Sequence, residues 1–140
     1  MLKSSPASIS HFIRQKSRDL GFDFCGISKA EFLAEEAPRL EQWLKDNKHG
    51  EMRYMENYFD LRVNPQKIVP GAKSVITLLQ NYYPEQQQQN NNYKVAKYAY
   101  GKDYHEIIRA KLKQLLANMN ATIGSIDGRG FVDSAPVLER

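Results

Sequence analysis

Apolar residues recur at helical spacing in several stretches of the chain, with short dense apolar runs between them. Ser5 and Pro6 predict an N-cap followed by proline at the first helical position, and Gly21 predicts a stop, so a helix is expected between them. The clearest helical pattern starts after Asp103, because Glu106 follows at capping-box spacing. It predicts a long helix that ends at Gly124 and has an apolar stripe of Ile108, Leu112, Leu115 and Met119.

Two further helices are expected, one opening at Pro38 and a shorter one over residues 52–59. The short apolar runs between the helices predict strands. These strands are expected over 22–27, over 74–79 as a buried central strand, over 95–100 and over 131–133. The alternation predicts an α/β fold with a small mixed sheet and flanking helices.

Composition narrows the class of protein. A chain of 140 residues with 41% hydrophobic content is long enough for one core, and a single domain over 1–140 is expected. No apolar run is long enough to span a bilayer and the N-terminus lacks a signal-peptide hydrophobic region, so we expect no membrane contact and a cytoplasmic location. A single cysteine, Cys25, excludes an internal disulfide and a four-cysteine metal or iron–sulfur site within the chain.

Charge and aromatic content leave the partner open. Twenty Lys and Arg against sixteen Asp and Glu give a net charge of +4, which permits contact with phosphates without requiring it. Eight tyrosines cluster between Tyr54 and Tyr104, and such a cluster suits stacking on flat ligands or bases. For most of them, a place at the edge of the core with the hydroxyl in water is the favoured interpretation. Residues 86–92 are Gln and Asn only, and predict a disordered surface insertion without a function.

Asp133 is the first candidate for chemistry. It follows a predicted strand, and ligand sites of open α/β sheets gather at strand ends. Burial could keep such an acid protonated until a substrate takes the proton. Position alone favours another role, as the N-cap of a helix that starts near Pro136.

His105, beside Tyr104, is the second candidate. It lies in the first turn of the long predicted helix, where backbone N–H groups attract anions. A histidine there could contact a phosphate or a propionamide-like side chain, or serve as a metal ligand. A partly exposed first-turn histidine without a ligand is an equal alternative. No histidine partner stands at ligand spacing, so no metal site is predicted. Arg62 could position a phosphate or be an ordinary surface arginine.

An ordered series of motifs is more specific than any one of them. In chain order the series comprises Gly-Phe-Asp-Phe-Cys-Gly-Ile at 21–27, Trp-Leu at 43–44, His-Gly-Glu-Met-Arg-Tyr-Met at 49–55, Arg-Val-Asn-Pro at 62–65, Pro-Gly-Ala-Lys-Ser-Val-Ile at 70–76, Asn-Tyr-Tyr-Pro at 81–84, Tyr-Ala-Tyr-Gly-Lys-Asp-Tyr-His at 98–105 and Val-Asp-Ser-Ala-Pro-Val-Leu-Glu-Arg at 132–140. From about Gly21 to its last residue, the chain closely resembles the N-terminal region of the epoxyqueuosine reductase family.

The resemblance implies an enzyme that reduces epoxyqueuosine to queuosine at the wobble position of tRNA. It implies a cobalamin held by an α/β domain related to that of the reductive dehalogenases, and two [4Fe–4S] clusters in a ferredoxin-like part. Asp133 matches the family's catalytic acid, and Arg140 matches an arginine near cofactor and substrate. Tyr104 and His105 match a stretch that we assign to cobalamin contact. The full-length family enzyme is expected to be a cytoplasmic monomer that acts on the anticodon stem-loop of tRNA.

The chain departs from the family pattern in ways that bear on activity. It carries no cluster cysteines, and Asn64 stands where an aspartate is usual. Residues 137–140 resemble the first turn of a helix without a body, which predicts a truncated protein. The resemblance implies that the truncation precedes the iron–sulfur part, so the chain is expected not to turn over alone, because no cluster delivers electrons. The alternatives are a non-catalytic module that binds cobalamin or tRNA, and an isolated folding unit with no ligand.

Overall fold

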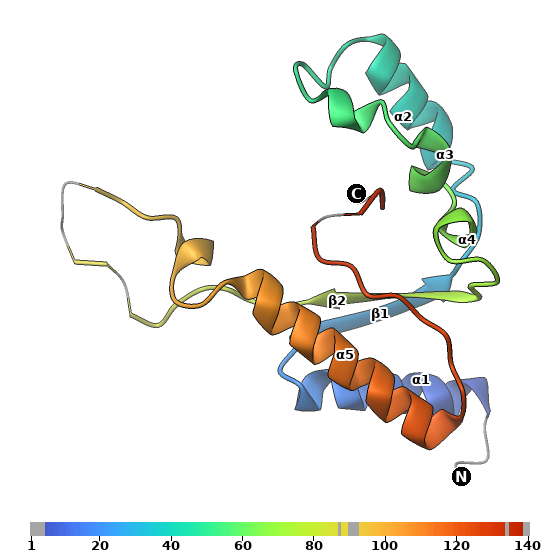
Figure 1. The fold of residues 1–140 in the computed structure, drawn as a ribbon, viewed down its shortest axis with the longest axis vertical. Helices are drawn as coiled ribbons and strands as arrows, with labels where there is room; N and C mark the ends of the chain where they lie inside the picture. The colour runs from blue at the N-terminus through green and yellow to red at the C-terminus, as the bar shows by residue number, and fades with distance from the viewer. Residues whose placement is uncertain (1–4, 87, 90–92, 134, 139–140) are drawn as a thin grey trace. The chain divides into compact units, whose positions relative to one another are not determined.

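The computed structural model of the protein describes residues 5–86, 88–89, 93–133 and 135–138. Its elements follow the chain in the order shown in Figure 1: α1 (Pro6–Asp19), β1 (Phe24–Lys29), α2 (Glu36–Lys45), the 3₁₀ turn η1 (Arg53–Met55), α3 (Phe59–Arg62), α4 (Pro65–Ile68), β2 (Ser74–Leu79), the 3₁₀ turn η2 (Lys97–Ala99) and α5 (Tyr104–Ile123). The residues form two compact units, 1–27 with 76–132 and 28–75 with 133–140. One domain over 1–140 stays a prediction.

Strands β1 and β2 form a two-stranded antiparallel sheet. The backbone N–H of Asp23 donates to the carbonyl of Leu79 at 2.9 Å, and the N–H of Ala30 donates to the carbonyl of Lys73 at 3.0 Å. The prediction of an α/β fold is confirmed in this coarse form, whereas the mixed sheet is wrong. The prediction of a buried central strand is wrong too, because β2 has a single partner and Leu79 is exposed.

Two of the expected strands are absent from the described residues. Residues 95–100 contain η2, and their side chains are mostly exposed, so no neighbouring strand satisfies an extended backbone there. Residues 131–133 have no regular structure. Asp133 adopts a positive φ of 55°, which an extended strand does not accommodate.

The first unit is built on α1 and α5, which lie on the same side of the sheet in Figure 1. Ile13 of α1 forms a buried cluster with Leu115 and Met119 of α5. Alternate strand residues pack against this cluster, as the two-residue period of a strand requires; they are Cys25, Ile27, Ile76 and Leu78. The predicted helix ends are confirmed as well. Ser5 caps α1 by accepting the N–H of Ser8, and Asp103 caps α5.

The second unit contains α2, η1, α3 and α4. Its buried cluster joins Ala37 and Leu40 of α2 to Val63, and Trp43 and Leu138 pack around it. Helix α2 begins at Glu36, before the expected start at Pro38. The single helix expected over 52–59 is divided into η1 and α3, because Tyr58 adopts a left-handed φ of 60° that no α-helix accommodates. No described helix is both long and apolar enough to cross a membrane.

Candidate functional site

The first turn of α5 brings Tyr104 and His105 together. Their rings stack with centroids 4.1 Å apart and planes 27° from parallel, and both side chains are half-buried. Sequence position alone suggested two neighbouring residues, whereas the structure gives a stack in which each ring covers one face of the other. An outer face of such a stack suits a flat ligand, because aromatic rings stack face to face with an offset.

Asp103 fixes the orientation of this ring pair. Its Oδ1 accepts the backbone N–H of His105 at 2.9 Å and lies 2.8 Å from Nδ1 of the same residue. A carboxylate only accepts hydrogen bonds, so this contact requires a proton on Nδ1. The backbone hydrogen bond from His105, followed by the bond from its ring, lowers the pKa of Asp103 below its ordinary value. Asp103 therefore stays charged and sets the tautomer of His105.

Two further ring contacts lie near the Tyr104–His105 pair. Tyr98 meets Tyr104 edge to face, with ring centroids 6.1 Å apart and an interplanar angle of 88°. The neighbouring Lys97 places Nζ 3.9 Å from the centre of the Tyr83 ring. Gly101 lies between these groups with a φ of +79°, and a Cβ built there would meet nothing within 4 Å. Space is therefore open beside the first turn of α5.

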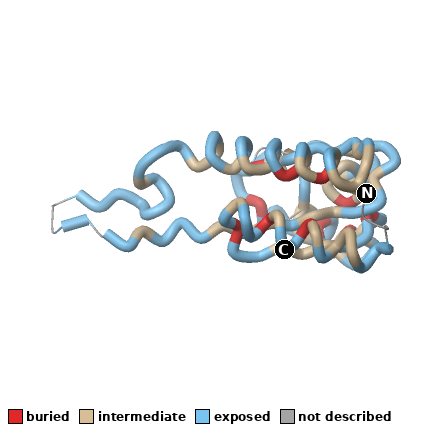
Figure 2. The backbone as a smooth tube through the Cα atoms, turned by 90° about the horizontal axis from the view of Figure 1, so that it is seen from below, coloured by how far each residue is buried: buried red, intermediate tan, exposed pale blue. Residues whose placement is uncertain are grey.

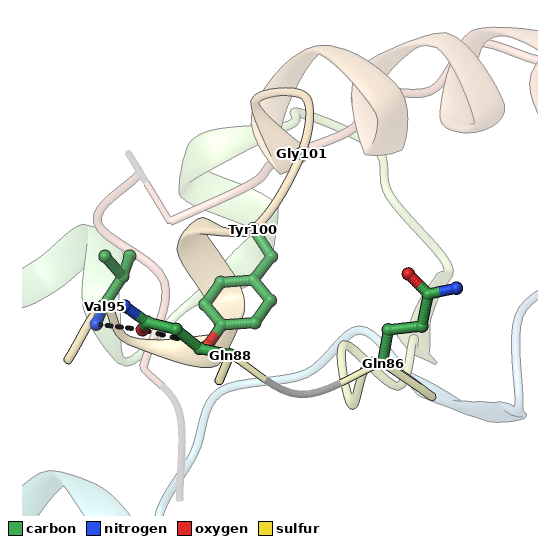
Figure 3. A pocket seen from close by; sticks show the side chains of 5 residues that line it. All are labelled: Gln86, Gln88, Val95, Tyr100 and Gly101. Carbon is green, nitrogen blue, oxygen red and sulfur yellow. Dashed lines mark hydrogen bonds between the residues drawn. The ribbon is translucent and has the colours of Figure 1, made fainter. Parts of the chain in front are cut away.

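An open pocket of about 470 Å³ lies in the same unit, at the segment between β2 and α5 (Figure 3). It is lined by Gln86, Gln88, Val95, Tyr100 and Gly101. The amide of Gln88 donates to the carbonyl of Tyr93 at 2.7 Å and accepts the N–H of Val95 at 3.1 Å. Gln88 therefore ties the segment together, while residues 87 and 90–92 of the expected disordered insertion lie outside the described residues.

Asp133 belongs to the second unit. Its side chain is exposed, and it engages in an interaction within the structure. The alternative role as a helix cap is wrong for the described residues, because residues 135–138 form no helix. The left-handed backbone of Asp133 forms a turn that aspartate tolerates better than most residues. Arg140, the other residue assigned to this end of the site, lies outside the described residues.

Arg62 and Asn64 both have hydrogen-bond partners within the second unit. Arg62 donates from Nη2 to the carbonyl of Tyr54 at 2.9 Å and from Nε to the carbonyl of Asn57 at 3.1 Å. Its guanidinium therefore ties the turn before α3 to the helix. Asn64 caps α4 by accepting the N–H of Gln66 at 3.0 Å, a bond that an aspartate in its place would also make.

The motif at 49–55 places a histidine in the interior. His49 is buried beside Trp43, with ring centroids 5.7 Å apart, and its Nε2 lies 2.7 Å from a carboxylate oxygen of Glu56. Its Nδ1 is buried without a hydrogen-bond partner among the described residues. Within the same residues, no group of three His, Cys, Asp or Glu side chains is placed to hold a metal ion.

Sequence reasoning missed Asp103 as a site residue. Its spacing to Glu106 marked it correctly as a helix cap, but not as the group that orients the His105 ring. A capping acid two positions before a histidine was the available signal, since the cap already directs its carboxylate toward the first turn. The Lys97–Tyr83 contact had no such signal, because fourteen positions separate the two residues.

Comparison with known proteins identifies the family. The family model described as epoxyqueuosine reductase QueG, DUF1730, matches residues 62–134, just over half of the chain. Curated epoxyqueuosine reductases are similar over nearly the whole chain. The protein from Leadbetterella byssophila is 58% identical over 91% of this chain and 42% of its own length, that from Cellulophaga algicola 59% over 94% and 43%, and that from Pseudomonas aeruginosa 40% over 96% and 39%. The chain thus spans about two fifths of the length of these relatives.

Solved structures agree in fold. An epoxyqueuosine reductase from Streptococcus thermophilus superposes with a TM-score of 0.81 at 20% identity, covering 94% of this chain and 36% of that one. A crystal structure of epoxyqueuosine reductase with an epoxyqueuosine-modified tRNA-Tyr stem-loop gives 0.80 at 20% identity, covering 96% and 36%. The motif series, the family match and these relatives lead to one conclusion: the chain belongs to the epoxyqueuosine reductase family.

Proposed function

We propose that this chain is the cobalamin-holding and proton-donating part of an enzyme that reduces epoxyqueuosine to queuosine in tRNA. The observation that carries the proposal is the family match over residues 62–134, which includes Tyr104, His105 and Asp133. The proposed activity is the one that the relatives are named for. The proposed substrate class, tRNA, is that of the stem-loop complex of a structural neighbour. The enzyme is proposed to act as a cytoplasmic monomer.

The first turn of α5 fits one side of a corrinoid. The stack of Tyr104 and His105 offers an aromatic ring face, and open space adjoins Gly101. We assign Tyr104 and His105 to cobalamin contact on these grounds. A relation to the cobalamin-binding domain of the reductive dehalogenases belongs to the same proposal. When bound, the cofactor supplies a reduced cobalt that can open the epoxide.

Asp133 is proposed as the proton donor. The epoxide oxygen leaves as water, so reduction to the alkene consumes two electrons and two protons, and an acid beside that oxygen lowers the barrier to its departure. Asp133 is exposed in the structure, so in this proposal bound cofactor and substrate shield its carboxyl from water. Arg140 is proposed to contact cofactor and substrate.

Electrons are proposed to come from two [4Fe–4S] clusters held by cysteines outside this sequence. The chain's single cysteine, Cys25, lies in β1 and packs against the core of the first unit. No cluster can be ligated by one thiolate. The 140-residue chain is therefore proposed to bind its ligands without turning over on its own.

Titration of the chain with hydroxocobalamin, followed by the absorbance of the corrin, tests the cofactor assignment. Tyr104→Ala and His105→Ala each remove one ring of the stack. Each is expected to weaken hydroxocobalamin binding about tenfold or more, which corresponds to a loss of roughly 1.4 kcal/mol or more in binding free energy. His11→Ala, an exposed histidine of α1, is the matched control. Unchanged affinity in both variants contradicts the assignment.

A single-turnover assay tests Asp133. The chain is loaded with hydroxocobalamin, reduced chemically, and mixed with a stem-loop that carries epoxyqueuosine. Asp133→Asn is expected to slow queuosine formation by about a hundredfold or more, the usual scale for a lost general acid. Asp127→Asn, another exposed aspartate, is the matched control. Equal rates in the two variants remove Asp133 from the mechanism.

A further inference from the structure

We infer that the segment between β2 and α5 carries a surface that binds unpaired nucleotides of RNA. The surface, called here the Tyr–Lys surface, consists of Tyr82, Tyr83, Lys97 and Tyr98. All four residues belong to the first unit and are exposed. The inference rests on the proposed function in taking the RNA to be part of the substrate, and it adds which residues hold nucleotides outside the reacting one.

The exposed rings are the first argument. Tyr82, Tyr83 and Tyr98 are 65%, 55% and 56% exposed, and Figure 2 shows the segment between β2 and α5 as almost continuously exposed. The tyrosines expected to fill the edge of a core are therefore on the surface at these positions. A base stacked on a tyrosine ring contributes about 1–3 kcal/mol in single-stranded complexes, and its gain does not depend on base identity.

The surface is held in place by bonds on both sides. The carboxylate of Asp23 accepts the N–H of Asn81 at 2.6 Å, and Oδ1 of Asn81 accepts the N–H of Tyr83 at 2.9 Å. These two bonds fix the turn after β2. The ammonium of Lys97, 3.9 Å from the ring centre of Tyr83, then joins that turn to η2. A surface ordered before binding loses less conformational entropy when it binds.

Charge selects the partner. Three exposed lysines, Lys94, Lys97 and Lys102, lie in this segment with two exposed acids, Glu85 and Asp103. None of the three lysines forms an ion pair within the part of the chain that the structure describes. Cations interleaved with tyrosines match a phosphate backbone with accessible base faces, and paired strands hide those faces. The surface therefore fits unpaired RNA in preference to a duplex.

The Tyr–Lys surface is continuous with the proposed cofactor residues. Tyr98 follows Lys97 directly in the chain and contacts Tyr104 edge to face, and Tyr104 stacks on His105. Nucleotides held by the tyrosines would thus lie beside the residues that we assign to cobalamin. This continuity supports a role in orienting the loop that contains the modified nucleotide.

Fluorescence anisotropy with labelled RNA tests the inference on the 140-residue chain. The probes are the unmodified anticodon stem-loop, a single-stranded oligonucleotide and a duplex of equal length. The single-stranded and stem-loop RNA are expected to bind more tightly than the duplex. Tyr83→Ala and Tyr98→Ala are each expected to weaken single-strand binding about fivefold to a hundredfold. Lys97→Gln is expected to reduce the slope of log affinity against log salt by about 0.7.

Matched controls separate the surface from general effects. Lys113→Gln removes an exposed lysine of α5, Tyr58→Ala removes an exposed tyrosine of the second unit, and both are expected to bind like the unaltered chain. Tyr98→Leu keeps apolar bulk and is expected to lose affinity like Tyr98→Ala. Thermal unfolding checks that each variant is folded.

The possible results distinguish failure of the RNA surface from failure of the cofactor assignment. Equal affinity for duplex and single strand, or tyrosine variants that bind like the controls, would overturn the inference. A parallel hydroxocobalamin titration separates it from the proposed function. Lost RNA selectivity with intact corrinoid binding overturns this inference alone, whereas RNA binding without corrinoid binding overturns the cofactor assignment alone.

Discussion

A single oxygen of Asp103 contacts His105 twice, through the backbone N–H at 2.9 Å and through Nδ1 at 2.8 Å. The same atom thus begins helix α5 and orients the ring in its first turn. Folding of the helix and geometry of the proposed cofactor surface are therefore linked at one residue.

Replacement of Asp103 separates these two roles. Asp103→Ala removes the cap and is expected to lower the free energy of unfolding by about 1 kcal/mol, whereas Asp103→Ser keeps a capping oxygen and is expected to cost less. Both variants lose the ring contact and are expected to weaken hydroxocobalamin binding. Urea unfolding and the corrin titration measure the two effects. Normal corrinoid affinity in both variants would show that the ring needs no fixed orientation.

The lowered pKa of Asp103 predicts a pH dependence. Because the folded-state pKa of Asp103 lies below its unfolded value, the contribution of this carboxylate to stability is fully present above the unfolded pKa and is lost as pH falls through the folded pKa. Asp103→Asn is expected to lose less stability than the unaltered chain as the pH falls, because it has no carboxylate to protonate at this position. The urea midpoints of the variant and of the unaltered chain, measured across the acid range at equal salt, test this. Parallel curves would contradict the prediction, and Asp127→Asn is the matched control.

Gly101 is expected to require its glycine for backbone reasons alone. Its φ is +79°, while a Cβ would meet no atom within 4 Å, so Gly101→Ala carries conformational strain without a clash. The expected loss in the free energy of unfolding is about 1–2 kcal/mol. Gly101→Asn is expected to lose less, because asparagine tolerates left-handed backbone. Equal losses in the two variants would point to contacts instead of strain.

Arg62 is expected to act through structure and not through a phosphate. Arg62→Ala removes two hydrogen bonds to carbonyls, of Tyr54 and Asn57, and is expected to lower the free energy of unfolding by about 1–3 kcal/mol. Arg62→Lys is expected to recover only part, since an ammonium lacks the fork of a guanidinium. Chemical unfolding measures the loss, and RNA affinity per folded molecule is expected to stay constant. A selective loss of RNA affinity would restore the phosphate role.

Val63 is expected to dominate the stability of the second unit. It is 2% exposed, and Val63→Ala is expected to lower the free energy of unfolding by about 2 kcal/mol through two lost carbon atoms and the cavity left behind. Trp43, the chain's single tryptophan, packs on the same cluster, so its fluorescence follows unfolding there. Val95→Ala, at an exposed valine, is the control and is expected to change the midpoint little.

Local signals predicted the helices of the first unit well. Ser5, Pro6 and Asp103 act at neighbouring backbone groups, so α1 and α5 could be located from the chain alone. The failures concern pairing. Residues 95–100 have side chains typical of a strand, but they contain η2. A strand forms only where a second strand supplies its hydrogen bonds, and local sequence does not show whether one is there.

The same distinction applies to the candidate site, where contacts between sequence neighbours were predictable and contacts between separate segments were not. Tyr104 and His105 are neighbours in sequence, so a joint role was predictable, and their stacking agrees with it. The contact between Lys97 and Tyr83 depends on how two segments return to each other, which no local pattern encodes. The left-handed turn at Asp133 is also a product of the folded chain, since aspartate adopts extended backbone more readily.

The partly buried Cys25 is a natural probe of local opening in the core of the first unit. Its thiol packs from β1 against the cluster of Ile13, Leu115 and Met119, and no second cysteine competes for reagent. Modification by a thiol reagent is therefore expected to quicken when that cluster opens and to slow when it packs more tightly. The rate, compared with that of an unfolded peptide, follows such opening. Ligand binding at the first turn of α5 can thus be followed from a thiol in β1, in unlabelled protein.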